Sequence, residues 1–132
     1  MNKCIFIFDD DVDILEVCSI TFETEGYKVV TASSCENILS KVAAAAPDLI
    51  IMDNKIPDMG GIIASNSLKA SSQFQHIPIL FFSANADVQQ LAAEAQADLF
   101  MEKPFDLSDL YQKLEYLFSL DWRHIKSPGQ QI

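Results

Sequence analysis

The chain has 132 residues, of which 49% are hydrophobic and 21% charged, as is ordinary for a single globular domain. Its formal net charge of -10 is high for this length. Proteins that bind nucleic acid draw most of their affinity from Lys and Arg that neutralise phosphates. The acidic balance therefore disfavours direct nucleic-acid binding and favours solubility.

The cysteines and the apolar runs indicate in which cellular compartment the protein is expected. Cys4, Cys18 and Cys35 are odd in number and lack CxxC spacing, which argues against a disulfide framework or a zinc site. We expect buried thiols in a reducing compartment. No apolar run has the length of a membrane span, and residues 4–8 run directly into acids, unlike a signal peptide. These features predict a cytoplasmic protein without membrane insertion.

The N-terminal part predicts a buried strand followed by an amphipathic helix. Residues 3–8 are apolar, β-branched or aromatic, and they end on the acidic run Asp9-Asp10-Asp11. Helical spacing follows over residues 12–25, with Asp11 or Asp13 as the N-cap and Gly26 as the stop. The side chains expected to face the core are those of Leu15, Cys18 and Phe22.

A second strand and helix precede the strand on which the predicted site depends. Residues 27–31 favour a strand, and residues 35–46 favour a helix that ends before a proline. Residues 47–53 are again apolar and end abruptly on Asp53. A loop follows, in which Pro57 and a glycine pair delay the next helix. In the second helix, the side chains expected to face the core are those of Ile38, Leu39 and Val42.

The C-terminal half continues the same alternation. Residues 62–70 and 87–96 favour helices, and residues 79–82 and 97–101 favour strands. The final amphipathic helix covers residues 107–118, with Asp106 as its cap.

Strands thus alternate with helices five times, which indicates an α/β fold with a parallel sheet covered on both faces. We expect residues 1–120 to form the domain and residues 121–132 to form a partly disordered tail. The carboxyl ends of parallel strands meet at one edge of the sheet. The polar side chains predicted at this edge are Asp9, Asp10, Asp53, Ser83 and Lys103.

These residues suit phosphoryl transfer assisted by Mg²⁺. Neighbouring carboxylates repel one another, and a hard cation with oxygen ligands compensates them. Lys103 and Ser83 would hold phosphoryl oxygens while Asp53 acts as an in-line nucleophile and forms an acyl phosphate. Taken singly, Asp53 is equally suited to cap a helix, whereas Lys103 is better explained by a salt bridge and Ser83 by a turn. Their joint placement at strand ends favours the site.

The acidic run partly matches two other motifs. An EF-hand loop fails, because Ile14 occupies its sixth position in place of Gly and Ile20 its twelfth in place of Glu. In haloacid-dehalogenase-like phosphatases, Asp9 would be the nucleophile and Asp11 the acid. Asp13 and the short chain depart from that pattern, but the phosphatase stays open as an alternative.

The ordered motif resembles the receiver domain of two-component response regulators, from Lys3 to about Leu120. The resemblance implies a flavodoxin-like, doubly wound (βα)5 fold with strand order 2-1-3-4-5, similar to single-domain chemotaxis regulators. It also implies a phosphorelay protein that catalyses only its own phosphorylation and dephosphorylation and is otherwise not an enzyme. The matching residues are Asp9-Asp10, Asp53, Pro57, Met59, Gly61, Ser83-Ala84 and Lys103-Pro104.

By this resemblance Asp53 would accept the phosphoryl group and also bind Mg²⁺. Asp10 would bind the metal directly, and Asp9 mainly through metal-bound water. The backbone carbonyl of Lys55 would complete the protein ligands.

The resemblance further implies that Ser83 would bind a phosphoryl oxygen and that Lys103 would pair with the phosphoryl group through a loop with a cis Lys103-Pro104 peptide. Ser83 replaces the commoner Thr and keeps the hydroxyl. Phe100 occupies the position of the switch aromatic and, lacking a hydroxyl, would act by ring packing. Gln96 replaces a usual Gly, which predicts that the left-handed turn there is rearranged.

The implied partners are a histidine kinase or a histidine phosphotransfer protein, and a downstream target protein. On the first helix, Ile14 and Val17 are expected to project away from the core, which makes them candidate docking residues. Scattered surface hydrophobics are nearly as good an explanation. A pseudo-receiver that only docks partners is a further alternative, but it would be expected to have lost one of the acids or Lys103.

Overall fold

Five apolar runs form one parallel sheet in the computed structural model, which describes residues 3–57 and 59–119. The strand order is β2-β1-β3-β4-β5, so the predicted fold class and order are confirmed. The strands are β1 (Cys4–Phe8), β2 (Lys28–Ala32), β3 (Leu49–Asp53), β4 (Ile79–Ser83) and β5 (Leu99–Glu102). The helices are α1 (Val12–Thr24), α2 (Ile38–Ala45), α3 (Gly61–Lys69), α4 (Val88–Glu94) and α5 (Leu107–Ser119).

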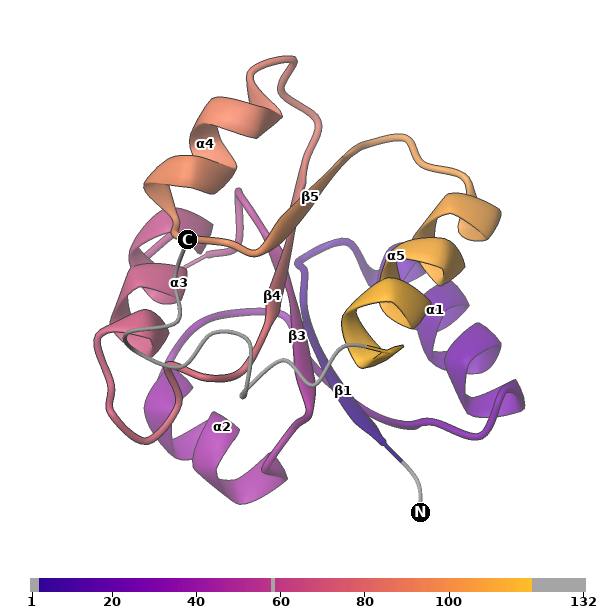
Figure 1. Ribbon diagram of the computed structural model, residues 1–132, viewed down its shortest axis with the longest axis horizontal. Coiled ribbons are helices and arrows are strands. Elements are labelled where there is room, and N and C mark those ends of the chain that lie inside the picture. Colours follow the sequence, from indigo (N-terminus) through magenta and orange to yellow (C-terminus); the bar gives the residue numbers. More distant parts are fainter. Residues whose placement is uncertain (1–2, 58, 120–132) are drawn as a thin grey trace.

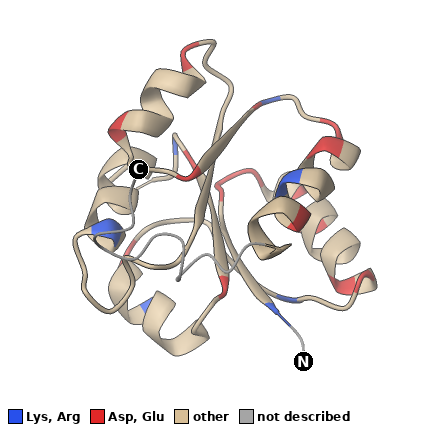
Figure 2. Cartoon of the chain, viewed as in Figure 1, with Lys and Arg blue, Asp and Glu red and all other residues tan. Residues whose placement is uncertain are grey.

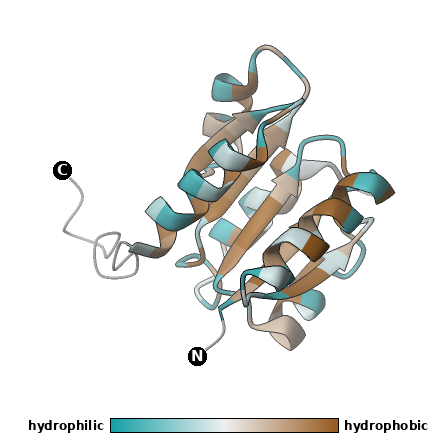
Figure 3. Cartoon of the chain, turned by 90° about the vertical axis from the view of Figure 1, so that its right-hand side faces the viewer, coloured by the Kyte–Doolittle hydropathy of each residue, from teal (hydrophilic) through white to brown (hydrophobic). Residues whose placement is uncertain are grey.

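The helices cover the sheet in two layers, each over its own core. In Figure 1, α1 and α5 lie on one side of the sheet and α2, α3 and α4 on the other. Phe6, Ile50 and Phe81 point toward the three-helix layer, whereas Ile7, Ile51 and Phe82 point toward the two-helix layer. The strands are therefore the most hydrophobic part of the fold, and the outer helix faces are more polar (Figure 3).

Local sequence signals fix how the chain leaves the sheet near the predicted site. The Asp11 carboxylate caps α1 by accepting hydrogen bonds from the backbone N–H of Asp13 at 3.0 Å and of Ile14 at 3.3 Å. Gly61 opens α3 against the end of β3, where a Cβ would collide with the carbonyl oxygen of Asp53. A residue without a side chain is thus required at Gly61, and it lets α3 begin directly behind the phosphoacceptor candidate.

Three expectations about local structure are wrong. Helix α2 begins at Ile38, not at residue 35, and Leu39 is 46% exposed instead of facing the core. Ile38 and Val42, four residues apart, supply the buried stripe of this short helix, and Leu39 is rotated out of it. Gln96 was expected to rearrange a left-handed turn, yet it keeps that conformation with φ 58°.

Other expectations hold. Cys4, Cys18 and Cys35 are all buried, and the Lys103-Pro104 peptide is cis. Among the described residues, no helix has both the length and the apolar character needed to cross a membrane. The predicted tail, residues 121–132, lies outside the described residues.

Candidate phosphoacceptor site

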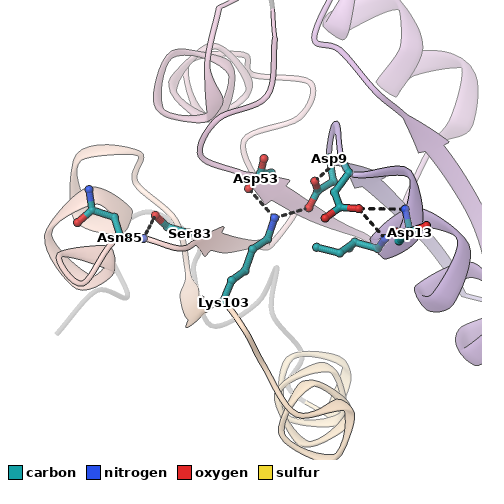
Figure 4. A network of polar contacts seen from close by, with 8 residues as sticks. Asp9, Asp13, Asp53, Ser83, Asn85 and Lys103 are labelled. Atoms are coloured by element: carbon teal, nitrogen blue, oxygen red, sulfur yellow. Dashed lines mark hydrogen bonds and ion pairs between the residues drawn. The ribbon is translucent and has the colours of Figure 1, made fainter.

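The carboxyl ends of four strands bring together side chains that are far apart in sequence. Asp9 follows β1, Asp53 ends β3, Ser83 ends β4 and Lys103 follows β5. The Lys103 backbone N–H donates to the Ser83 carbonyl at 2.8 Å, which extends the β4–β5 pairing to the site. Figure 4 shows Lys103 pointing between Asp53 and Asp9, with Ser83 on the opposite side of Asp53. The predicted convergence is therefore present.

Lys103 links two of the acids. Its Nζ donates to Asp9 Oδ2 at 2.8 Å and to Asp53 Oδ1 at 3.0 Å. The Asp9 side chain is fully buried and that of Asp53 is 6% exposed, so both ion pairs are shielded from water on the carboxylate side. The ammonium therefore offsets the repulsion between two buried carboxylates that lie next to one another.

A third carboxylate completes an oxygen cluster. Asp10 is exposed, and one oxygen atom each from Asp9, Asp10 and Asp53 lie within 4.8 Å of one another. Three carboxylates supply the hard oxygen donors that Mg²⁺ prefers, and an exposed side leaves room for the waters that this ion retains. The donor set therefore fits Mg²⁺.

Burial and charge shift the pKa values of the two central groups. Burial raises the pKa of Asp53 above its usual range, a hydrogen bond from Lys103 opposes this, and the neighbouring Asp9 adds to the rise. Burial would lower the pKa of Lys103, but its hydrogen bonds to Asp9 and Asp53 together with the charges of these two acids outweigh burial, so that this pKa is raised. Lys103 consequently stays charged wherever the two acids are ionised.

The Ser83 hydroxyl is buried and tied to the following loop. Its Oγ accepts a hydrogen bond from the Asn85 backbone N–H at 3.0 Å (Figure 4). Only 2% of Ser83 is exposed, because β4 is buried along its whole length.

The other predicted site residues lie outside this cluster. Lys55 lies in the turn after β3 with an exposed side chain, and Phe100 is 37% exposed on β5, outside both cores. Val17 is 48% exposed as expected. Ile14 does not project away from the core: it is half-buried and packs on the cluster below α1, because it lies four residues before the buried Cys18 and so on the same face of the helix.

One contact at the site was not predicted. The backbone N–H of Asp11 donates to Asp9 Oδ1 at 2.9 Å, while Lys103 holds the other oxygen. A carboxylate that bonds the amide two residues ahead is a common local motif of Asp, so the sequence did carry the signal. Both oxygens of Asp9 are thereby held in place.

Acidic residues outnumber basic ones in this chain, 19 to 9. They are spread over both sides of the sheet (Figure 2). Of the described lysines, only Lys103 enters the carboxylate cluster.

Comparison with known proteins matches this geometry to a family. The family model described as "Response regulator receiver domain" covers residues 5–115. The alkaline phosphatase synthesis transcriptional regulatory protein PhoP of Bacillus subtilis is 36% identical over the whole chain, which spans 54% of that relative. The transcriptional regulatory protein KdpE of Mycobacterium tuberculosis is 31% identical over 83% of the chain, which covers 48% of that protein. The chain thus spans about half the length of these curated relatives.

Solved structures agree. The chemotaxis response regulator CheY4 of Vibrio cholerae matches with a TM-score of 0.81 and 27% identity, covering 89% of this chain and 99% of that one. The response regulator TrrA of Thermotoga maritima, solved in complex with Mg(2+)-BeF, matches with a TM-score of 0.76 and 25% identity over 87% of this chain and 98% of that one. The phosphatase alternative finds no support. From its motif, its fold and these relatives, the chain belongs to the response regulator receiver domain family.

Proposed function

We propose that Asp53 accepts a phosphoryl group from a phosphohistidine of a histidine kinase or histidine phosphotransfer protein. The observation that carries the proposal is the Lys103 ammonium, which holds Asp53 Oδ1 at 3.0 Å and Asp9 at 2.8 Å at the strand ends. An Asp53 oxygen attacks phosphorus as the phosphorus–nitrogen bond breaks. The histidine nitrogen keeps the bonding electrons and takes a proton from water, and the product is an acyl phosphate on Asp53.

Lys103 and Ser83 stabilise the transferred group. The ammonium can shift from the Asp53 carboxylate to the phosphoryl oxygens without leaving Asp9, so it keeps one ion pair throughout. The Ser83 hydroxyl accepts its bond from Asn85, which leaves its own hydrogen to donate to a phosphoryl oxygen.

Mg²⁺ would be held by Asp9, Asp10, Asp53 and the backbone carbonyl of Lys55. When bound, it offsets negative charge on the carboxylates and on the phosphoryl oxygens. Asp9 is positioned for this role by its two fixed oxygens, and Asp10 by its exposure to solvent.

The test is to incubate the protein with acetyl phosphate and Mg²⁺ and to measure intact mass. We expect a gain of one phosphate, lost in Asp53→Asn and kept in the matched control Asp87→Asn, whose carboxylate is exposed on another loop. Labelling that persists in Asp53→Asn and disappears in Asp9→Asn, with turnover of a phosphate ester, would establish the phosphatase instead. No labelling of a folded parent protein would establish a pseudo-receiver.

The chain is then not an enzyme acting on a separate substrate, but it catalyses formation and hydrolysis of its own acyl phosphate. A role of Lys55 in hydrolysis is supported by its exposed side chain, which follows the acceptor by two residues. An ammonium there would occupy the approach of an in-line water, so phosphate loss should be faster in Lys55→Asn. An unchanged or slower loss would count against this role.

The output is a surface change that involves Ser83 and Phe100. Phosphorylation would draw the Ser83 hydroxyl toward the phosphoryl group, and the partly exposed Phe100 ring would move inward behind it. The phosphoryl group can shift this equilibrium only by its different affinity for the two states. NMR of the Phe100 ring should show a change on phosphorylation that is absent in Ser83→Ala. An unchanged ring environment in the phosphorylated parent would rule out this switch.

Val17 is the better candidate of the two docking residues, with Ile14 contributing only its exposed part. Val17→Ala should slow transfer from a phosphohistidine donor and leave acetyl phosphate labelling normal. The control is Leu39→Ala, an equally exposed hydrophobic change on α2. Equal slowing with both donors would contradict docking at Val17.

The wider setting follows from the family and stays a proposal. The downstream partner is a protein, and the site acts in the cytoplasm. The relatives PhoP and KdpE are transcriptional regulatory proteins by name, so the expected lack of direct nucleic-acid binding is not confirmed for a longer protein that contains this domain. Salt-dependent DNA binding by the chain itself would contradict the expectation drawn from its charge of -10.

A further inference from the structure

Within residues 3–57 and 59–119, strand β2 has one unpaired edge. It is the first strand in the sheet order, and β1 is its one pairing partner among these described residues. β1, β3 and β4 are buried along their whole length, but every residue of β2 is half-buried or exposed, including Val29 and Val30. Edge strands rich in valine invite pairing unless proline, a bulge or charge protects them. β2 contains only one such protecting residue, Lys28, at its start.

The hydrogen bonds to β1 show which backbone groups face the open edge. Lys28 N–H donates to Lys3 O at 2.9 Å, and Ala32 O accepts from Asp9 N–H at 3.1 Å. Residues of a parallel strand alternate between pairing with one neighbour and facing the other side. Lys28, Val30 and Ala32 therefore pair with β1, whereas the N–H and C=O groups of Val29 and Thr31 point away from the sheet.

A groove of ≈ 800 Å³ follows this edge on both sides of the strand. On the α2 side it is lined by Phe6, Val30 and Ala44, and on the α1 side by Val12 and Leu15. A strand laid beside β2 would place alternate side chains on these two sides. The groove thus combines free main-chain groups with apolar contacts for both sets of side chains.

The charge of the groove indicates what kind of molecule binds there. Lys28 and Lys41 both line it, in a chain with 9 basic and 19 acidic residues. Neither forms an ion pair with a described carboxylate. A second copy of this chain would bring another net charge of -10, whereas a peptide with acidic side chains would meet two available ammonium groups.

We propose that the free edge of β2 binds an extended peptide segment of a partner protein by strand addition, with alternating apolar residues and at least one Asp or Glu. Main-chain bonds to Val29 and Thr31 supply affinity, and the groove and its lysines supply specificity. This surface is separate from the phosphoacceptor site and does not depend on the proposed function.

The test selects ligands from a displayed library of random peptides of about seven residues, long enough to pair with a five-residue strand. Enriched sequences are then synthesised and titrated against the full chain. We expect alternating apolar and acidic residues. Hydrogen exchange should reveal new protection of the Val29 and Thr31 amides on binding, with Val30 already protected in the free protein.

Two variants separate strand addition from other binding modes. Thr31→Pro removes an outward N–H and leaves the β1 ladder intact, so it should weaken binding by about tenfold or more. The control Thr31→Val keeps that N–H and should bind normally. Circular dichroism establishes that both are folded. Lys28→Glu with Lys41→Glu should weaken acidic peptides and improve analogues that carry Lys instead.

Other outcomes would overturn the proposal. These are selection of helical or basic peptides, equal binding by Thr31→Pro and Thr31→Val, or protection elsewhere than at β2. Concentration-dependent dimerisation that is lost in Thr31→Pro would mean that a second copy of the chain, and not a peptide of another protein, pairs with β2.

Discussion

Ser65 carries a buried hydroxyl that the fold does not use. The residue is fully buried on α3, and its Oγ has no hydrogen-bond partner among the described residues. An unsatisfied hydroxyl costs about 1–3 kcal/mol, so Ser65→Ala should raise the free energy of unfolding by about 1 kcal/mol or more. Ser67→Ala, two residues along the same helix, measures the gain from helix propensity alone, on the order of 0.5 kcal/mol. Urea denaturation compares the two. A Ser65 variant no more stable than the Ser67 variant would mean that water satisfies the hydroxyl.

Cys18 makes stability depend on alkaline pH. Burial, followed by the nearby charge of Asp9, raises the pKa of its thiol from 9.0 to about 11. The unfolded chain therefore loses this proton at a lower pH than the folded chain does. The contribution of Cys18 to the free energy of unfolding is fully present below pH 9. It falls as the pH rises toward about 11, by up to about 1.4 kcal/mol per pH unit.

Removing the thiol should flatten this dependence. In Cys18→Ala, the free energy of unfolding measured in urea from about pH 8 to about pH 11 should fall less steeply than in the parent. Some slope should remain, because burial also raises the pKa values of Cys4, Tyr27 and Tyr111. Parallel curves for the two proteins would contradict the assignment to Cys18.

At the scale of elements, Lys69 fastens the end of α3 to the start of β4. Its Nζ donates to Ile77 O at 2.9 Å and to Asp98 Oδ2 at 3.0 Å, and Asp98 Oδ2 also accepts from the Ile79 N–H at 2.8 Å. The two side chains are 9% and 2% exposed. This ion pair lies away from the phosphoacceptor site, so its role is to hold the loop of residues 70–78 against the sheet.

Removing the ammonium should leave the Asp98 carboxylate buried beside fewer donors. Lys69→Met is expected to lower the free energy of unfolding by about 3–5 kcal/mol, as for other buried pairs that lose one partner. Lys113→Met makes the same change on α5, at a lysine for which the described residues provide no ion pair, and should cost far less. Similar losses in both variants, measured by thermal melts, would contradict this role of Lys69.

Elements were predictable from sequence where a single strong signal decided them. The run ending on Asp53 is apolar enough to be a buried strand whatever surrounds it, and the structure buries it completely. The buried face of α2 was harder to predict from periodicity. Ile38 and Leu39 are both apolar, and only packing decides which of them is buried. β2 is a similar case: two valines look alike in a central strand and in an edge strand. Burial there depends on neighbours that only the tertiary structure supplies.

The same distinction applies to the turn at Gln96. Loss of the usual glycine predicts a changed backbone, but the left-handed conformation persists with φ 58°. The Gln96 side chain donates to Asn66 Oδ1 at 2.7 Å, and Asn66 Nδ2 donates to the Glu94 carbonyl at 3.1 Å. These contacts between α3 and the end of α4 offset the strain of a side chain in this region, on the order of 1 kcal/mol. They could not be inferred from a local motif.

At the scale of the whole molecule, the site concentrates negative charge in a chain whose net charge is already -10. The topology is responsible, because a parallel sheet collects the ends of β1 and β3 beside each other. The sequence alone predicted that the carboxylates and Lys103 lie close together. It could not predict that the two oxygens of Asp9 have different partners: one accepts a hydrogen bond from Lys103 and the other from the Asp11 amide. Which partner each oxygen has depends on the path of the loop after β1.

This concentration of charge predicts that Mg²⁺ stabilises the folded chain. A ligand that binds only the folded state adds about 2.7 kcal/mol when present at about a hundred times its dissociation constant. The melting temperature of the parent should therefore rise with Mg²⁺ at constant ionic strength. Asp10→Asn should lose most of this rise and still fold, because Asp10 is exposed and its charge lies beside two other carboxylates. Asp87→Asn, which removes an exposed acid outside the cluster, should respond as the parent does. An equal rise in Asp10→Asn would mean that Mg²⁺ acts on the general charge of the chain and not at the carboxylate cluster.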